Sequence, residues 1–149
     1  MRYRIYPCGE AAVTFELDGP ITPESNEMIL QMNAMILANP ISGLQEVIIS
    51  YSSLTLLFDI KLLQRSLLNA QTIFGYTENF LSGIYNSISR TGKPNGNTHL
   101  IPVCYDPSLG FDLPVLASRK NMDPAAFTEL HHAKVYRIYM IGFLPGFPY

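Results

Sequence analysis

The chain has 149 residues, of which 48% are hydrophobic and 15% are charged, and its formal net charge is −2. An ordinary globular domain has about 25% charged residues, so an unusual share of this surface lacks ionic groups. The net charge argues against binding to nucleic acid and against a polybasic role at a membrane surface. Either a partner protein covers much of the uncharged surface, or the chain is part of a longer fold.

The cysteines and the N-terminal residues carry no sign of export. Cys8 and Cys104 are too few for a disulfide framework, and neither belongs to a Cys-x-x-Cys pair that would hold zinc. Residues 1–7 lack the apolar core of a signal peptide, and the longest apolar runs are far shorter than a membrane span. We therefore expect a cytoplasmic protein with reduced thiols, with no metal and no membrane contact.

The first two predicted elements are strands over residues 3–7 and 11–17, which Gly9 can join through a tight turn. Hydrophobic side chains of the second strand alternate with other residues, so that one face collects Val13, Phe15 and Leu17. This alternation predicts a strand with one face against a core.

A helix is predicted next, beginning at Thr22-Pro23 and ending at Asn39-Pro40. Threonine can cap the first turn, and proline suits the first helical position. Hydrophobic residues then recur at helical spacing: Met28, Ile29, Met32, Met35 and Ile36. A methionine-rich stripe could form a binding groove, but we expect it to pack in the core, because methionine fills irregular gaps well.

Residues 44–51 and 54–60 are predicted as a second pair of strands, because both segments are rich in β-forming side chains. Residues 62–90 have a helical pattern, which we expect Gly75 to interrupt and Thr77 to start again as a cap. The chain therefore repeats the order of two strands followed by a helical segment.

This order indicates a first domain over residues 1–90, with an α+β fold. We expect a two-layer α/β sandwich, with helices on one face of an antiparallel sheet. A linker is predicted at 91–97, where two glycines, one proline and two asparagines occur within seven residues.

The remaining residues, 98–149, are predicted to contain two strands and two short helices. His99–Tyr105 and Val135–Ile141 have the composition of strands, whereas Asp112 and Asp123 can each cap a helix with proline in its first turn. The last strand is apolar on both faces, which is typical of a strand inside a sheet. Since about 50 residues with so few strands cannot bury these faces, we expect an N-terminal fragment of a longer fold.

The chain ends in the uncharged octapeptide Gly-Phe-Leu-Pro-Gly-Phe-Pro-Tyr, residues 142–149. Glycines allow sharp turns and close approach to a ligand, prolines fix the backbone, and aromatic rings offer stacking faces. This composition is typical of a rigid binding loop and equally of a turn at the corner of a barrel. It matches neither a dinucleotide fingerprint nor a P-loop.

His131 and His132 are the other candidates for chemistry, near the expected end of a helix. Adjacent helical side chains point about 100° apart, so this pair is not a bidentate metal site. One imidazole could serve an active site, whereas the simpler interpretation is a basic side chain that caps the helix C-terminus.

The octapeptide resembles the G-F-x-P-G-F-P-Y signature of the family formed by the B subunits of 5-oxoprolinase, also called allophanate hydrolase subunit 1. The family includes Kip-type inhibitors of a histidine kinase and the corresponding part of the carboxyltransferase region of urea carboxylase. Weaker matches occur in the family's order: Gly9–Ala12, Tyr51–Leu54, Ile101–Tyr105, and Glu129–His131 with Tyr136. The chain departs from many relatives at Ile49-Ser50, where they have a proline before the turn.

The resemblance implies that residues 98–149 begin a cyclophilin-like β-barrel domain that continues beyond Tyr149. It also implies the B subunit of an ATP-dependent 5-oxoprolinase, which acts with the A and C subunits to open 5-oxoproline to glutamate. ATP is then used by the complex, no cofactor is expected on this chain, and the fragment is expected to be inactive alone. The alternatives are a regulator that inhibits a sensor histidine kinase and a component of an allophanate hydrolase or urea carboxylase.

Carried over to this sequence, the resemblance implies one catalytic and four substrate-binding residues. His131 is expected to take part in proton transfer or substrate contact. The octapeptide is expected to supply backbone donors and shape through Gly142, Pro145, Gly146 and Phe147.

Overall fold

The computed structural model describes residues 1–67, 72–88 and 97–149, which belong to two compact units. One unit comprises Met1–Asn95 and Ile138–Tyr149, and the other comprises Gly96–Arg137. Apart from Asn97, the linker predicted at 91–97 lies outside the described residues. The division into domains at 1–90 and 98–149 therefore stays a prediction.

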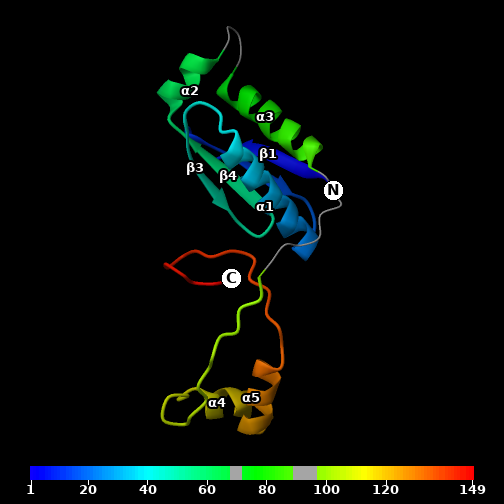
Figure 1. The fold of residues 1–149 in the computed structure, drawn as a ribbon, viewed down its shortest axis with the longest axis vertical. Helices are drawn as coiled ribbons and strands as arrows, with labels where there is room; N and C mark the ends of the chain where they lie inside the picture. The colour runs from blue at the N-terminus through cyan, green and yellow to red at the C-terminus, as the bar shows by residue number, and fades with distance from the viewer. Residues whose placement is uncertain (68–71, 89–96) are drawn as a thin grey trace. The chain divides into compact units, whose positions relative to one another are not determined.

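The first unit contains a four-stranded antiparallel sheet in the order β1–β2–β4–β3 (Figure 1). Its strands are β1 (Tyr3–Pro7), β2 (Ala12–Leu17), β3 (Leu44–Ile49) and β4 (Ser53–Phe58). All four expected strands are confirmed, and each has the β-forming composition that predicted it. Two hairpins meet through their second strands, which places β2 and β4 at the centre of the sheet.

The register of the central strands brings the largest side chains together on one face. Phe15 pairs with Leu54, and Val13 pairs with Leu56. A slip of one residue would turn these side chains to the opposite face, so the hydrophobic pattern specifies the pairing. The outer pairing of β3 with β4 is interrupted by a bulge between Leu44 and Glu46.

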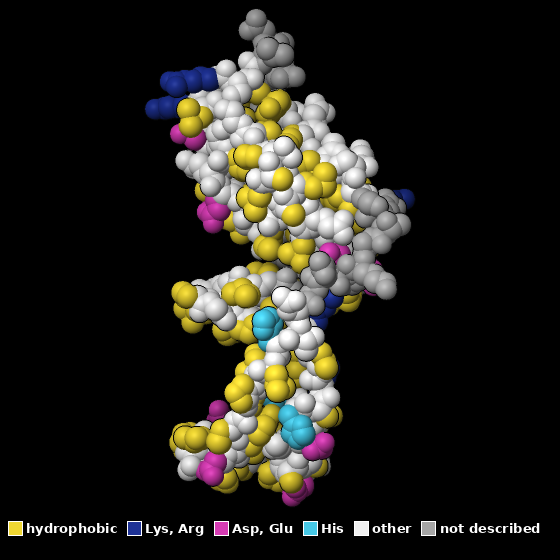
Figure 2. Space-filling view, in the orientation of Figure 1, with side chains coloured by type: hydrophobic (Ala, Val, Ile, Leu, Met, Phe, Trp, Pro, Cys, Tyr) yellow, Lys and Arg dark blue, Asp and Glu magenta, His cyan; other side chains and the backbone are white. Residues whose placement is uncertain are grey.

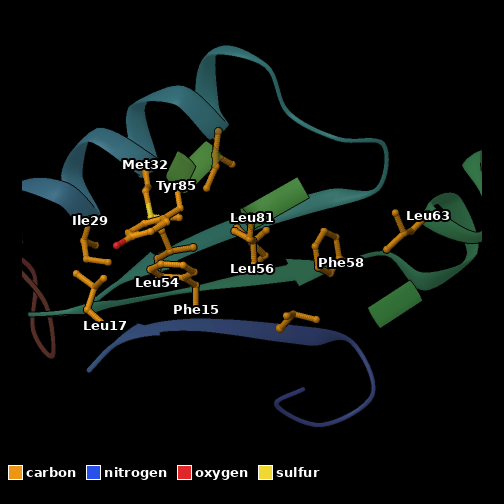
Figure 3. Close-up of a cluster of buried hydrophobic side chains, with 12 residues drawn as sticks. Phe15, Leu17, Ile29, Met32, Leu54, Leu56, Phe58, Leu63, Leu81 and Tyr85 are labelled. Carbon is orange, nitrogen blue, oxygen red and sulfur yellow. The ribbon is translucent and has the colours of Figure 1, made fainter. Parts of the chain in front are cut away.

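The described residues of this unit contain three helices, α1 (Pro23–Ala38), α2 (Ile60–Ser66) and α3 (Ile73–Ser87). In the first unit α1 contacts β3 and β4, while α3 contacts β1 and β2, so both helices cover the same face of the sheet (Figure 1). The core lies between these layers (Figure 3) and consists of Val13, Phe15, Leu17, Ile29, Met32, Ile36, Leu54, Leu56, Phe58, Leu63, Leu81 and Tyr85. The α+β fold with two layers is thereby confirmed for this unit.

The first helix begins where its sequence predicts. Thr22 Oγ1 accepts a hydrogen bond from the Ser25 N–H, and Ser25 Oγ accepts one from the Thr22 N–H. This reciprocal capping satisfies two amides that the helix itself leaves without partners. Ile29, Met32 and Ile36 are fully buried, which confirms that the centre of the methionine-rich stripe packs in the core.

The prediction that Gly75 ends one helix and Thr77 caps the next was wrong. The cap of α3 is Thr72, whose hydroxyl accepts from the Gly75 N–H. Thr77 is fully buried inside α3, and its hydroxyl donates to the carbonyl of Ile73. Gly75 is tolerated because it lies in a capped first turn, and Thr77 satisfies its hydroxyl within its own helix. The segment that precedes the cap, residues 68–71, lies outside the described residues.

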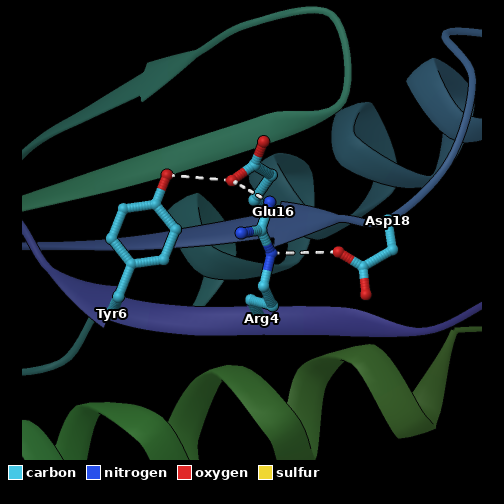
Figure 4. A network of polar contacts seen from close by, with 4 residues as sticks. All are labelled: Arg4, Tyr6, Glu16 and Asp18. Atoms are coloured by element: carbon cyan, nitrogen blue, oxygen red, sulfur yellow. Dashed lines mark hydrogen bonds and ion pairs between the residues drawn. The ribbon is translucent and has the colours of Figure 1, made fainter.

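The sheet face opposite the core carries a polar network (Figure 4). Arg4 contacts Glu16 at 3.1 Å and Asp18 at 3.0 Å, and the Tyr6 hydroxyl donates to Glu16 over 3.0 Å. Glu16 follows the buried Phe15, so the alternation of a strand turns its side chain to this face. Such exposed ion pairs each contribute at most about 1 kcal/mol.

The second unit contains α4 (Leu113–Arg119) and α5 (Pro124–His132), which contact each other. Both predicted helices are thus confirmed, although only Asp123 makes the expected capping bond, to the Ala125 N–H. Before α4, hydrogen bonds from the hydroxyl and N–H of Ser108 hold the pKa of the Asp106 carboxyl below its usual value. Within the described ranges, no helix has the length and apolarity needed to cross a membrane.

Neither His99–Tyr105 nor Val135–Ile141 forms a strand, contrary to the prediction. A strand requires a ladder of hydrogen bonds with a neighbour, and β-forming composition alone does not supply one. Among the described residues of 97–149, the structure pairs Ile141 with Pro148 through a single isolated bridge. The cyclophilin-like β-barrel therefore stays a prediction.

Candidate functional site

His131 lies in the last turn of α5, where two tyrosines of the second unit surround it. Its Nδ1 shares a hydrogen bond with the Tyr105 hydroxyl, and the Tyr136 hydroxyl donates to its backbone carbonyl over 3.1 Å. The centroids of the two tyrosine rings lie 5.8 and 5.5 Å from that of the imidazole. Residues before α4 and after α5 thus fix the orientation of one histidine.

The neighbouring histidine has a different partner. His132 Nε2 lies 2.9 Å from a carboxylate oxygen of Glu129, one turn earlier in α5. The His132 ring also lies near Tyr105, with centroids 6.4 Å apart, but the hydrogen bonds from the two tyrosines go to His131. Its Nδ1 is engaged with Tyr105, so Nε2 is the nitrogen left to accept or donate a proton. The His131 side chain thus has a defined hydrogen-bond partner, Tyr105, in addition to its place in the last turn of α5.

An open cavity of about 260 Å³ adjoins this histidine. Its walls are mainly apolar, and its lining residues are Phe127, Leu130, His131, Lys134 and Tyr136. The Lys134 ammonium lies 5.7 Å from the centre of the Tyr136 ring. A cavity with apolar walls, one ammonium group and one imidazole has the chemistry to hold a small carboxylate and to transfer a proton to it or from it.

Hydrophobic side chains are exposed over the unit that carries α4 and α5 (Figure 2). The large ones include Leu109, Phe111, Val115, Leu130 and Val135. Exposed apolar patches of this kind mark sites of protein or ligand binding.

The predicted substrate-binding residues lie in a hairpin of the first unit, formed by residues 139–149 and called here the C-terminal hairpin. Backbone hydrogen bonds join its two arms, from the Tyr139 N–H to the Tyr149 carbonyl at 2.7 Å and from the Tyr149 N–H to the Met140 carbonyl at 2.8 Å. Nearer the tip, the Gly142 N–H donates to the Phe147 carbonyl over 3.0 Å. The octapeptide is therefore one arm and the tip of a closed hairpin.

The tip of this hairpin holds a phenylalanine in a strained conformation. Phe143 has φ +63°, and the Leu144 N–H donates across it to the Gly142 carbonyl over 2.7 Å. This bond closes a γ-turn whose central residue has positive φ, a rare and strained form. Such strain costs about 1–3 kcal/mol and concentrates at ligand-binding and switch segments. The Phe143 side chain is 85% exposed, so burial does not explain the strain.

The structure brings the four predicted substrate-binding residues together in this tip: Gly142, Pro145, Gly146 and Phe147. Gly146 has φ +80°, a conformation that glycine adopts without strain. The Phe147 ring contacts Phe143 and Tyr149, with centroids 6.2 and 5.1 Å apart. His131 belongs to the other unit, and the roles of all five residues in binding or catalysis stay predictions.

Three structural features were not predicted from the sequence: the contact of Tyr105 with His131, the positive φ of Phe143 and the burial of Asn26. Tyr105 was expected in a strand, and no local pattern connects it with His131, 26 residues later. Phe143 stands inside the distinctive octapeptide, but composition does not reveal a positive φ at a phenylalanine. Asn26 is almost fully buried in α1, and its signal was a polar residue three positions before Ile29, on the face of the helix that enters the core.

Residues 3–149 match the family model described as carboxyltransferase domain, subdomain C and D. Among curated proteins, the chain is similar to the B subunit of 5-oxoprolinase from Bacillus subtilis strain 168, with 28% identity across the whole chain. The match covers 62% of that relative, so the chain spans less than two thirds of its length.

The solved structures that are similar to this one include the following two. TTHA0988 has a TM-score of 0.67 and 29% identity, over 92% of this chain and 24% of its own. The N-terminal domain of the histidine kinase inhibitor KipI from Bacillus subtilis has a TM-score of 0.50 and 22% identity. That match covers 57% of this chain and 85% of the KipI domain, and it shows a common fold.

Proposed function

The chain belongs to the carboxyltransferase domain family of subdomains C and D, and from this premise we propose that it acts as the B subunit of an ATP-dependent 5-oxoprolinase. The observation that supports this most directly is the 28% identity to the Bacillus 5-oxoprolinase protein along the whole chain. In this function the protein assembles with the A and C subunits, and the complex uses ATP to open 5-oxoproline to glutamate. Since the chain spans 62% of that relative, the activity is proposed for the complex and not for these residues alone.

The proposed roles of the predicted site residues are those that the family resemblance implies, and the geometry of each unit supports them. His131, held through Nδ1 by Tyr105, exchanges a proton through Nε2 or contacts the substrate. Lys134 at the same cavity supplies the positive charge that a carboxylate substrate such as 5-oxoproline needs. The residues of the hairpin tip bind substrate through backbone and shape: Gly142, Pro145, Gly146 and Phe147.

The test is ATP-dependent release of glutamate from 5-oxoproline by a form of this chain extended to the length of its Bacillus relative, mixed with the A and C subunits. General acid–base catalysis contributes about 10²–10⁴-fold, so His131→Ala is expected to lower the rate by at least about 100-fold. His132→Ala is the matched control and is expected to keep the rate, because His132 pairs with Glu129. An inactive parent complex contradicts the function, and an active, folded His131→Ala variant contradicts the catalytic role.

A second candidate function is the inhibition of a sensor histidine kinase. The observation that favours it is the fold shared with the N-terminal domain of KipI. It predicts direct association with the kinase and loss of kinase autophosphorylation when the A and C subunits are absent. Glutamate release without any effect on the kinase favours the enzyme subunit, and the reverse result favours the regulator.

A further inference from the structure

One buried side chain of the first unit joins the C-terminal hairpin to the turn between β3 and β4. Asn26 lies in the first turns of α1 and is 1% exposed. Its Nδ2 donates to the Tyr51 carbonyl over 3.1 Å and to the Tyr139 carbonyl over 3.2 Å. A single amide group therefore uses both of its hydrogens to hold segments that lie 25 and 113 residues away in sequence.

The same two segments also meet through aromatic rings. The Tyr51 ring lies 5.7 Å from that of Tyr139 and 6.2 Å from that of Tyr149, in edge-to-face geometry. Tyr139 and Tyr149 are hydrogen-bonded to each other across the base of the hairpin. The Tyr51 ring thus contacts both arms at the end opposite the strained tip, and edge-to-face pairs of this kind stabilise a defined orientation.

Core packing alone does not account for an asparagine at this position. The buried positions that follow Asn26 in α1 are hydrophobic (Ile29, Met32 and Ile36), and the Asn26 Oδ1 is buried without a hydrogen-bond partner among the described residues. A buried acceptor without a partner destabilises the fold, so a hydrophobic residue of similar size would serve packing better. What the amide supplies, and no hydrophobic side chain can, is a pair of donors aimed at two separate carbonyls.

We infer that Asn26 and Tyr51 form a clasp that positions the C-terminal hairpin against α1 and the turn between β3 and β4. Asn26 is a positioning residue, which acts through the hairpin and not on a ligand. With the base of the hairpin held, the tip keeps the γ-turn at Phe143 and the turn at Gly146 in one conformation. The clasp is inferred from contacts within the first unit. Only the role of the hairpin tip in binding substrate rests on the proposed function.

The test uses nuclear magnetic resonance of the 149-residue chain and needs no activity. In the unchanged protein, both Nδ2 protons of Asn26 are expected to show through-hydrogen-bond couplings to the carbonyl carbons of Tyr51 and Tyr139. Ring contacts between Tyr51 and Tyr149 are expected in the same sample. Absence of both signals overturns the clasp without any substitution, even if a variant were to fail to fold.

Asn26→Asp keeps the size of the side chain and removes both donors. We expect the hairpin amides of Tyr139, Gly142 and Tyr149 to exchange with solvent at least about tenfold faster, since a lost pair of hydrogen bonds lowers the cost of local opening. The amides of β2 and β4 are expected to keep their exchange rates. The matched control is Asn33→Asp, which makes the same change seven residues along α1, at another amide whose Oδ1 is buried without a partner among the described residues.

The possible outcomes separate positioning from a general structural role. Faster exchange confined to the hairpin in Asn26→Asp, with no change there in Asn33→Asp, supports the clasp. Equal acceleration in the hairpin and the central strands, or unchanged ring contacts and hairpin exchange, overturns it. Because none of these measurements depends on 5-oxoproline, failure of the clasp and failure of the proposed function are distinguishable.

Discussion

Gly43 has φ +79° immediately before β3, and backbone atoms at the start of α2 lie close to it. Its carbonyl accepts a hydrogen bond from the Asp59 N–H over 2.8 Å. A Cβ atom at this position would lie 2.7 Å from the Leu63 nitrogen and 2.8 Å from the Asp59 oxygen. Both atoms belong to the backbone, so no side-chain movement relieves the contact.

Gly43→Ala is therefore expected to lower the free energy of unfolding by about 3 kcal/mol, through strain at positive φ and displacement of α2. Urea denaturation followed by circular dichroism measures the change. Gly83→Ala is the control with the opposite sign, because Gly83 lies in α3 with open space around it. Removing a helical glycine is expected to stabilise α3 by about 0.5–1 kcal/mol. Equal stability of the two variants contradicts the explanation.

The polar network opposite the core predicts the titration of one tyrosine. The hydrogen bond that Tyr6 donates to Glu16 raises the pKa of Tyr6 above 10.0, and burial and the Glu16 charge add to it. The raised pKa means that this contact stabilises the fold below pH 10 and is lost as the pH rises through the pKa of the folded state. Glu16→Ala is expected to lower the pKa of Tyr6, as measured by the ring-carbon shifts in a titration.

The matched substitution for that titration is Asp18→Ala. Asp18 also pairs with Arg4, but it makes no hydrogen bond to Tyr6. The pKa of Tyr6 is expected to stay raised in this variant. A similar fall in both variants would show that the negative charge of this face as a whole, and not the bond to Glu16, controls the tyrosine.

At the scale of elements, the start of α1 has the most local explanation. Thr22 and Ser25 satisfy each other's amides, and Pro23 needs no partner for its nitrogen. Thr22→Ala removes one half of this arrangement and is expected to destabilise the protein by about 1 kcal/mol. Thr22→Ser retains the hydroxyl and is expected to change the free energy of unfolding by at most a few tenths of a kcal/mol. Parallel urea denaturation of the two variants measures the difference.

Elements were predictable where their causes are local. The four strands and α1 follow from alternation, helical spacing and capping residues that lie within each segment. The start of α3 was misplaced because Gly75 and Thr77 carry ordinary break and cap signals, whereas the actual cap is Thr72, three residues before the glycine. The two strands expected in residues 98–149 do not form. A strand exists only with a neighbour that pairs with it, and local composition does not supply that neighbour.

The candidate site was predictable by residue type and not by contact. The octapeptide stood out through its glycines and aromatics, and the structure does gather its residues in one turn. The partners Tyr105 and Asn26 act on residues 26 and 113 positions away, and no spacing rule reports such pairs. Backbone strain at Phe143 also leaves no trace in composition.

At the scale of the whole molecule, low charge and exposed apolar surface accompany a chain that spans 62% of its Bacillus relative. Under the proposed function, we expect the 149-residue chain mixed with the A and C subunits to release no glutamate from 5-oxoproline. The form extended to the relative's length is expected to do so in the same assay with ATP. Full activity of the shorter chain would show that the reaction needs nothing beyond the two units described.

The bulge in β3 has a consequence for behaviour at high concentration. β3 is an outer strand of the sheet, and a flat outer strand can recruit the same strand of another molecule. The shift between Leu44 and Glu46 breaks the regular row of amides and carbonyls, and Glu46 places a negative charge along it. Together they are expected to oppose edge-to-edge association of the protein through this strand.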